Sequence, residues 1–217
     1  SIDFIEWSYF LSVLNMSNLL KDIYSQSFYR QFSLALASVI PSFNRSRFMD
    51  LIFCDDFEDY ELKERMSHTA QVMREFLPSD FLKATQTIKK IIQYLINAGV
   101  KEESIEFMFI PEYIEMQGIE DYELSIDAFE FITQFTSCEF AVRPFIIKYK
   151  KKMLKQMLCW SKHEHHMVRR LASEGTRPRL PWSISLPSLK ENPEPLRNIL
   201  KNLKNDEYEI VRRSVAN

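Results

Sequence analysis

The stretch PSDFLKATQTIKKIIQYLINAG, residues 78–99, carries the clearest secondary-structure signal in the chain. Its apolar residues at 88, 91, 92 and 95 follow the i, i+3, i+4, i+7 spacing of a single helix face. Ser79 or Asp80 can cap the start, and Gly99 can end the helix. The stretch therefore predicts an amphipathic helix.

The same helical period runs through almost the whole chain. It predicts further helices at about 18–40, 57–76, 104–116, 122–137, 140–159, 164–174, 195–204 and from 207 onward. Four of the prolines, at 41, 78, 111 and 193, fall near the ends of these segments, where proline does least harm. No segment shows the alternation of a half-buried strand, so we expect an all-α fold.

A weak internal repeat indicates how the helices are arranged. MVRRLASEG at 167–175 recurs as IVRRSVAN at 210–217, and FAVRPFI at 140–146 shares the Val-Arg pair. The steps are 26 residues from Val142 to Val168 and 43 from Val168 to Val211, and the second is typical of a two-helix HEAT or armadillo repeat. We therefore expect a right-handed α-solenoid of HEAT-like antiparallel helix pairs with a concave basic face.

Charge is distributed very unevenly along the chain. The net charge is only −2, yet residues 141–217 hold seventeen Lys and Arg against seven Asp and Glu, about +10. Residues 1–140 hold the remaining eleven basic and twenty-three acidic groups, about −12. A basic half of this kind is typical of a polyanion-binding surface, although solvated helices can also segregate charge by chance.

Composition argues against several classes of protein. Three glycines are too few for a many-stranded sandwich or a glycine-rich phosphate loop, and three widely spaced cysteines make neither a disulfide framework nor a zinc ribbon. No run of eighteen apolar residues occurs, and Asp3 and Glu6 stand where a signal peptide carries basic residues. We expect a cytoplasmic protein without a membrane partner.

Four local features could suggest functional sites but favour structural explanations. HEHH at 163–166 spreads its imidazoles around a helix start, so we expect a polar turn and no bound zinc. Cys138 has no histidine near it in sequence and fits a small buried thiol. The acidic stretch at 54–64 lacks the central glycine of a calcium loop and fits the polar entry to a helix, while KYKKK at 148–152 fits a solvated helix face.

Glutamate and arginine recur together in two of the repeats. Arg170 and Glu174 are four residues apart, as are Glu139 and Arg143, so on helices each pair would share a face. Such couples are either ordinary surface ion pairs, worth a few tenths of a kcal/mol, or parts of a site. Spacing alone leaves both interpretations open.

Longer motifs carry a resemblance to a known family. SCEFAVRPFI at 137–146, VRRLASEGTRPRLPW at 168–182 and VRRSVAN at 211–217 resemble the bacterial DNA alkylation repair family, specifically its AlkC type of DNA glycosylase. FEDYELKERMSHTAQVMREFLPSDF at 57–81 and FIPEYIEMQG at 109–118 extend the likeness over about residues 18–217. The AlkD type is a more distant relative with the same fold. The resemblance implies a protein of HEAT-like repeats that removes cationic N3-methylated bases from DNA, notably 3-methyladenine, with 3-methylcytosine as a further candidate.

The resemblance also implies roles for particular residues. Glu139 and Glu174 match the family's active-site glutamates, and Trp182 matches the aromatic residue near the lesion. A family aspartate in an LND turn is expected just beyond VRRSVAN, where this sequence ends at Asn217. Our candidates for DNA phosphate contacts are Arg143, Arg169, Arg170, Arg177, Arg179, Arg212 and Arg213.

Chemistry makes sense of these residue types. Hydrolysis of an N-glycosidic bond passes through a sugar with oxocarbenium character, which a carboxylate can stabilise while orienting water. A base methylated at N3 is already cationic and leaves readily, so no strong general acid is needed. The resemblance implies attack on a lesion that stays largely stacked in a bent duplex, in contrast to base flipping.

The sequence thus predicts a monofunctional, cofactor-free alkylbase DNA glycosylase of base excision repair. We expect one HEAT-like domain at 18–217, C-terminally truncated, after a non-native N-terminal extension at 1–17. We expect a monomer that binds double-stranded DNA containing alkylated bases. The alternative is a non-catalytic HEAT-repeat scaffold that binds DNA or protein, because solenoids often serve as scaffolds.

Overall fold

The computed structural model describes residues 20–217, so the predicted extension at 1–17 lies outside the described residues. This part of the chain is helical throughout and contains no strand, as the sequence predicts. The helices are α3 (Gln26–Val39), α4 (Arg45–Ile52), α5 (Leu62–Arg74), α6 (Phe81–Asn97), α7 (Phe109–Gly118), α8 (Tyr122–Ile132), α9 (Val142–Tyr149), α10 (Lys151–Trp160), α11 (His166–Glu174), α12 (Pro187–Glu191), α13 (Arg197–Leu203) and α14 (Glu209–Ala216). Short 3-10 turns precede α5, α7 and α13 at Phe57–Asp59, Ile105–Phe107 and Glu194–Leu196.

Side-chain caps fix several helix starts. The Asp80 carboxylate accepts from the Lys83 amide at the start of α6, and Asp121 does the same for Leu124 at the start of α8. Glu61 and Glu64 form a reciprocal capping box on α5. Each cap satisfies an amide that the first helical turn leaves without an internal partner. The acidic stretch at 54–64 is therefore the entry to a helix, as predicted.

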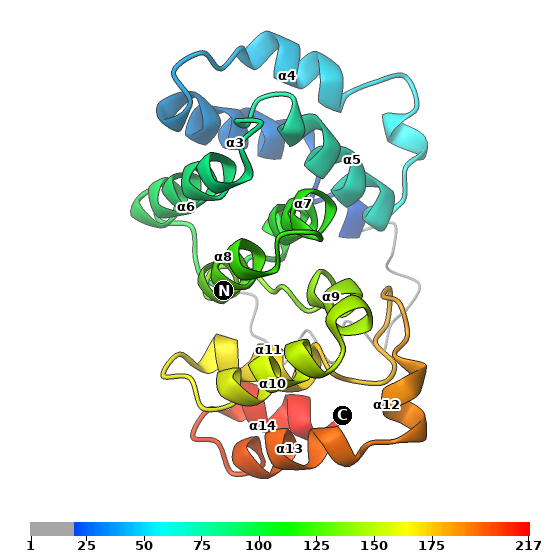
Figure 1. Cartoon of the computed structure of the whole chain (residues 1–217). Helices are drawn as coiled ribbons and strands as arrows, with labels where there is room; N and C mark the ends of the chain where they lie inside the picture. The colour runs from blue at the N-terminus through cyan, green and yellow to red at the C-terminus, as the bar shows by residue number, and fades with distance from the viewer. Residues whose placement is uncertain (1–19) are drawn as a thin grey trace.

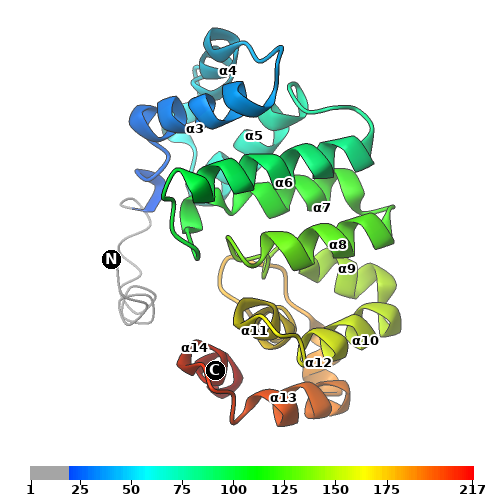
Figure 2. The same cartoon turned by 90° about the vertical axis from the view of Figure 1, so that its left-hand side faces the viewer.

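The helices stack in layers to form the predicted α-solenoid. Figures 1 and 2 show α3 to α8 in the upper part of the molecule and α9 to α14 in the lower part. The upper part is held by aromatic rings: Phe32 packs edge to face on Phe109 at 5.2 Å, and Phe107 lies 5.1 Å from Phe135. Aromatic pairs of this kind stabilise beyond the area they bury. A continuous buried core runs from Tyr24 to Val211.

The two copies of the Val-Arg-Arg motif lie on neighbouring helices. One copy begins α14 and the other lies in α11, and these two helices pack directly against each other. Val168 and Val211 are both fully buried, and the hydroxyls of Ser173 and Ser214 are 2.5 Å apart between the helices. The two copies of the motif are thus alike in packing as well as in sequence.

Three element boundaries differ from the sequence-based prediction. Helices α4 and α12 fall in segments that we expected to be loops, because α4 buries only two of its residues and α12 only one. The predicted helix at 140–159 is broken at Lys150, which has φ 44° and separates α9 from α10. The lysines of 148–152 therefore do not share one helix face. None of the described helices combines the length and apolarity needed to span a bilayer.

Candidate functional site

Glu139 lies in the turn that precedes α9 and is almost completely buried, with 2% of its surface exposed. Its Oε2 accepts hydrogen bonds from the Ser137 hydroxyl and from Nη1 of Arg170, each at 2.8 Å. Its Oε1 has no hydrogen-bond partner among the described residues. Arg170 and Ser137 therefore hold this carboxylate through one of its two oxygens.

Glu174, at the end of α11, is equally buried but differently bonded. Its Oε1 accepts from Nη1 of Arg177 at 2.6 Å, and its Oε2 accepts from the Ser214 hydroxyl at 2.6 Å. Burial alone raises the pKa of Glu174, but Arg170, Ser214 and Arg177 together lower it below its usual value. Both oxygens of Glu174 are therefore engaged within the protein.

Arg170 connects the two glutamates. It projects from α11, is 6% exposed, and feels the charges of Glu139, Glu174 and Glu103. Burial lowers its pKa, but these carboxylates outweigh burial and raise it. A buried arginine among carboxylates fixes their separation and orientation, since its fork of donors has a rigid geometry.

The predicted Glu139–Arg143 couple does not form an ion pair. Glu139 lies in a turn and α9 begins only at Val142, so the i, i+4 geometry of a helix does not apply. Glu139 pairs instead with Arg170, 31 positions along the chain. The short-range partner of Glu174 is Arg177.

Arg143 is buried and bound within the fold, which argues against the phosphate contact predicted for it. It is 0% exposed, and its guanidinium donates to the carbonyls of Ile184, Gly175, Arg177 and Pro178. Burial, followed by the charge of Arg177, lowers its pKa to about 10. The side chain ties α9 to both arms of the loop that carries Trp182.

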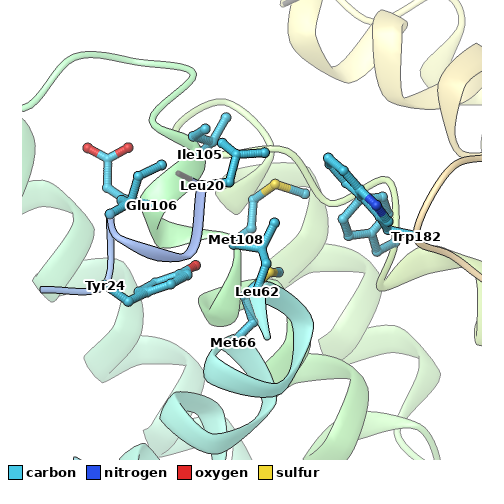
Figure 3. Close-up of a pocket in the computed structure, with 10 residues that line it drawn as sticks. Leu20, Tyr24, Leu62, Met66, Ile105, Glu106, Met108 and Trp182 are labelled. Atoms are coloured by element: carbon cyan, nitrogen blue, oxygen red, sulfur yellow. The ribbon is translucent and has the colours of Figure 1, made fainter. Parts of the chain in front are cut away.

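Trp182 lies in this loop with φ 59°, the left-handed region that side chains rarely adopt. Its ring lines one end of an apolar pocket, with Tyr24 and Glu106 at the other end and Met108 between them (Figure 3). Strained backbone of this kind persists where the surrounding structure holds it, often at functional sites. The hydrogen bonds of Arg143 supply that support here.

A second, smaller recess adjoins this pocket and contains Glu139. The two share Ile105 and Met108, which places the Trp182 pocket and the Glu139 recess side by side. Glu103 also lines the recess, a residue that sequence reasoning missed. The signal that could have found it is weak: three acidic residues in KEESIE, at 101–106, follow the predicted end of a helix at Gly99.

The other predicted DNA-contacting arginines differ in their freedom. Arg169 makes a two-point ion pair with Asp206, and Arg170 is buried with Glu139. Arg212 donates to the carbonyls of Asp206 and Glu207, and Arg213 pairs with Glu209. Arg179 is exposed and has no partner among the described residues.

Arg177 and Arg179 line an open groove of about 390 Å³ together with Lys190. The groove runs past Ser173 and Ser214, the serines that join α11 to α14. Since Ser214 and Arg177 also hold Glu174, this basic groove leads directly to the partners of a candidate site carboxylate.

The histidine motif at 163–166 and Cys138 have structural roles. His165 caps α11 by accepting from the Met167 amide, and His166 stacks on Tyr208 at 4.2 Å. Cys138 is fully buried, and its thiol donates to the carbonyls of Phe129 and Thr136. Residues 20–217 contain no group of three or more ligating side chains placed to hold a metal ion.

Together the geometry defines a class of protein: a helical solenoid with buried glutamates beside a strained tryptophan and a basic groove. No family model matches the chain. The uncharacterized protein YhaZ of Bacillus subtilis (strain 168) is 39% identical over 198 residues, which are 91% of this chain and 54% of YhaZ.

A solved structure shows the same fold. Pseudomonas fluorescens alkylpurine DNA glycosylase AlkC, bound to DNA containing an abasic site analog, matches with a TM-score of 0.83 and 30% identity. The match covers 91% of this chain and 53% of the AlkC chain. This chain thus spans about half the length of both similar proteins. The resemblance predicted from the sequence is confirmed: the chain is similar to an AlkC-type alkylpurine DNA glycosylase in both sequence and fold.

Proposed function

We propose that this chain contains the base-excising site of an alkylbase DNA glycosylase that hydrolyses the N-glycosidic bond of N3-alkylated bases. The observation that carries the proposal is Glu139: a buried carboxylate, held by Arg170 and Ser137, with one oxygen that has no partner among the described residues. A module that only binds phosphate gains nothing from such a carboxylate. The similarity to AlkC, an alkylpurine DNA glycosylase, supports the same conclusion.

Glu139 acts on the sugar. When the bond from C1′ to the base nitrogen breaks, the electron pair of that bond passes to the base and neutralises its positive charge. Positive charge then develops on the sugar. A fixed carboxylate in a water-poor recess stabilises that developing charge without having to reorganise. Arg170 and Ser137 bind Oε2, so Oε1 is the oxygen that faces this task.

Trp182 and Glu174 complete the site. The face of an indole attracts a cation, so Trp182 contributes to binding a cationic alkylated base such as 3-methyladenine. Glu174 acts by holding Arg177 in an ion pair and by interacting with the charge of Arg170. It is a positioning residue, because its own oxygens are occupied.

The DNA backbone contacts the groove of Arg177, Arg179 and Lys190. Cationic side chains that displace counterions from phosphates supply most of the sequence-independent affinity for DNA. Arg179 is available for such a contact without breaking an internal bond. The product is an abasic site, no cofactor is required, and one copy of the chain binds one duplex.

The test is release of free base from duplex DNA treated with a methylating agent, with the released bases identified by chromatography. We expect 3-methyladenine to be released by the whole gene product, and release to be lost when Glu139 and Glu174 are both changed to Gln. Intact, salt-sensitive DNA binding without any base release would overturn the proposal and favour a non-catalytic DNA-binding scaffold. Equal release by the double variant would also contradict it.

A further inference from the structure

The recess beside Glu139 is small and mixed in character. It has a volume of about 10 Å³ and is lined by Glu103, Ile105, Met108, Ser137, Glu139, Met167 and Arg170. This volume is close to the minimum that admits one water molecule, and a bound water needs two or more polar partners. The carboxylates of Glu103 and Glu139 supply them. The recess therefore suits a single water next to the group that stabilises the sugar.

The two carboxylates of the recess have opposite environments. Glu139 is paired with Arg170 at 2.8 Å and is hydrogen-bonded to Ser137. Glu103 lies beside the ring of His166, with 3.8 Å between Nε2 and Oε1, and it feels the charge of Arg170. A paired carboxylate is stabilised in its charged form, whereas an unpaired, part-buried one binds a proton more readily. Two carboxylates in one site with different environments are typical of a division between electrostatic and acid–base roles.

We propose that Glu103 is the general base of the site, which activates the attacking water in the recess that it shares with Glu139. This inference rests on the proposed glycosylase function and assigns the proton-transfer step within it. Burial raises the pKa of Glu103, with a smaller contribution from Glu102, while Arg170 and His165 oppose the rise. A base with a pKa closer to neutrality accepts a proton from water more effectively.

The step balances without a co-reactant. The water oxygen bonds to C1′ as the bond from C1′ to the base nitrogen breaks, and the electron pair of that bond passes to the cationic base. Glu103 takes one proton from the water, and its carboxyl group later releases the proton to solvent. The products are a neutral free base, an abasic sugar and one proton.

The backbone at Glu103 supports a functional role. Glu103 has φ 67°, and its amide donates to the carbonyl of Phe135 at 2.9 Å. Asparagine and glycine adopt this conformation far more easily than glutamate does. A glutamate at such a position costs stability, and strain of this kind clusters at active sites.

Several titratable groups lie near Glu103 and influence how the rate of base release depends on pH. Arg170, His165 and His166 face it from α11, Glu139 faces it across the recess, and Glu102 precedes it. Burial lowers the pKa of both histidines, so they are largely neutral at pH 7. Because the pKa of Glu103 is raised, the rate of base release is expected to rise as pH increases through that value and then to level off.

The experiment measures single-turnover release of 3-methyladenine by the whole gene product from pH 4.5 to 8. Glu103→Gln is expected to lower the plateau rate by about 10²-fold or more and to remove the acidic limb of the profile. The matched control is Glu102→Gln, an exposed neighbour, which is expected to stay within about twofold of the parent and to keep the limb. Glu139→Gln is expected to lower the rate but to keep the limb.

A second variant separates a functional role from a structural one. Glu103→Asn suits the left-handed backbone, so the melting temperature is expected to rise by about 2 °C while base release falls as in Glu103→Gln. Base release by Glu103→Gln at the parent rate, or with an unchanged acidic limb, would overturn the assignment of Glu103 and leave the glycosylase proposal intact. Absence of release by the parent protein contradicts the glycosylase proposal itself.

Discussion

The turn that carries Glu139 and the end of α11 that carries Glu174 offer the same side chain in two settings. Each glutamate is almost fully buried and is bound by an arginine and a serine. Around Glu139 both donors meet one oxygen, while around Glu174 each oxygen has its own donor. The difference teaches that burial and ion pairing alone do not identify a reacting carboxylate. We expect the reacting carboxylate to be the one that keeps an oxygen without a partner among the described residues.

The largest expected effect tests that distinction directly. Glu139→Gln should lower the single-turnover rate of base release by about 10³-fold, because a neutral amide does not stabilise the sugar's developing charge. Glu174→Gln should lower it by about 10-fold, since it weakens only the placement of Arg170 and Arg177. Both rates are measured on methylated duplex DNA at saturating protein, with affinity for undamaged duplex as the control. A larger loss for Glu174→Gln would reverse the roles.

The next largest effect concerns Arg143, which supports the loop that follows Glu174. Arg143→Met keeps the aliphatic stem but removes the donor to four carbonyls at 175, 177, 178 and 184. We expect unfolding free energy to fall by about 3 kcal/mol, which corresponds to a melting temperature about 6–12 °C lower. Thermal unfolding followed by circular dichroism measures it.

Hydrogen exchange sharpens the same prediction. Exchange should accelerate at 175–186 more than at 137–142, because Glu139 keeps its bonds to Ser137 and Arg170. The matched control is Arg212→Met, whose guanidinium also binds carbonyls but is exposed, and which should cost about 1 kcal/mol or less. Equal losses for the two variants would contradict the assignment of Arg143 as a buried tie.

A smaller effect is expected when one oxygen of Glu174 loses its donor, so that its bonding becomes more like that of Glu139. Ser214→Ala removes the hydroxyl that binds Oε2 and should cost about 1 kcal/mol of unfolding free energy. The pKa of Glu174 is below its usual value in the fold, because Arg170, Ser214 and Arg177 outweigh the effect of burial. Its stabilising contribution is therefore present above the pKa of the unfolded chain and is lost as pH falls through the folded value.

Removing the Ser214 hydroxyl raises the pKa of Glu174 in the fold, so this loss should begin at higher pH. The midpoint of acid unfolding is accordingly expected to shift upward relative to the parent. Ser188→Ala, at an exposed position on α12, is the control and should leave the midpoint unchanged. An unchanged midpoint for Ser214→Ala would mean that the serine does not stabilise the charged carboxylate.

The helical framework could be predicted from the sequence, because the apolar residues of a long amphipathic segment such as 81–97 indicate which helix face is buried. Helix α4 and helix α12 were missed, since each has a short apolar face and depends on packing against the rest of the chain. The break at Lys150 was missed for a related reason: no glycine or proline marks it. Its left-handed backbone is imposed by tertiary packing.

The candidate site could be predicted only in part. The family likeness placed Glu139, Glu174 and Trp182 in the chain, and the structure places Glu139 and Trp182 in adjoining recesses and connects the glutamates through Arg170. Local spacing predicted the wrong partner for Glu139, because a contact across 31 residues cannot be read from a helical period. Sequence reasoning missed Glu103 because its position depends on a left-handed backbone conformation, which a glutamate in the sequence does not indicate.

The smallest expected effect concerns arginines of the basic half. Arg179 has no internal partner among the described residues, whereas Arg212 binds two carbonyls, although both are exposed. Arg179→Gln should weaken binding to duplex DNA by about three- to tenfold and reduce the slope of log affinity against log salt by about 1, because one phosphate contact is lost. Arg212→Gln should change neither by more than about a third of that. Fluorescence anisotropy between 50 and 200 mM salt measures both, and an equal change in the two slopes would show that internal bonding does not decide which arginines contact DNA.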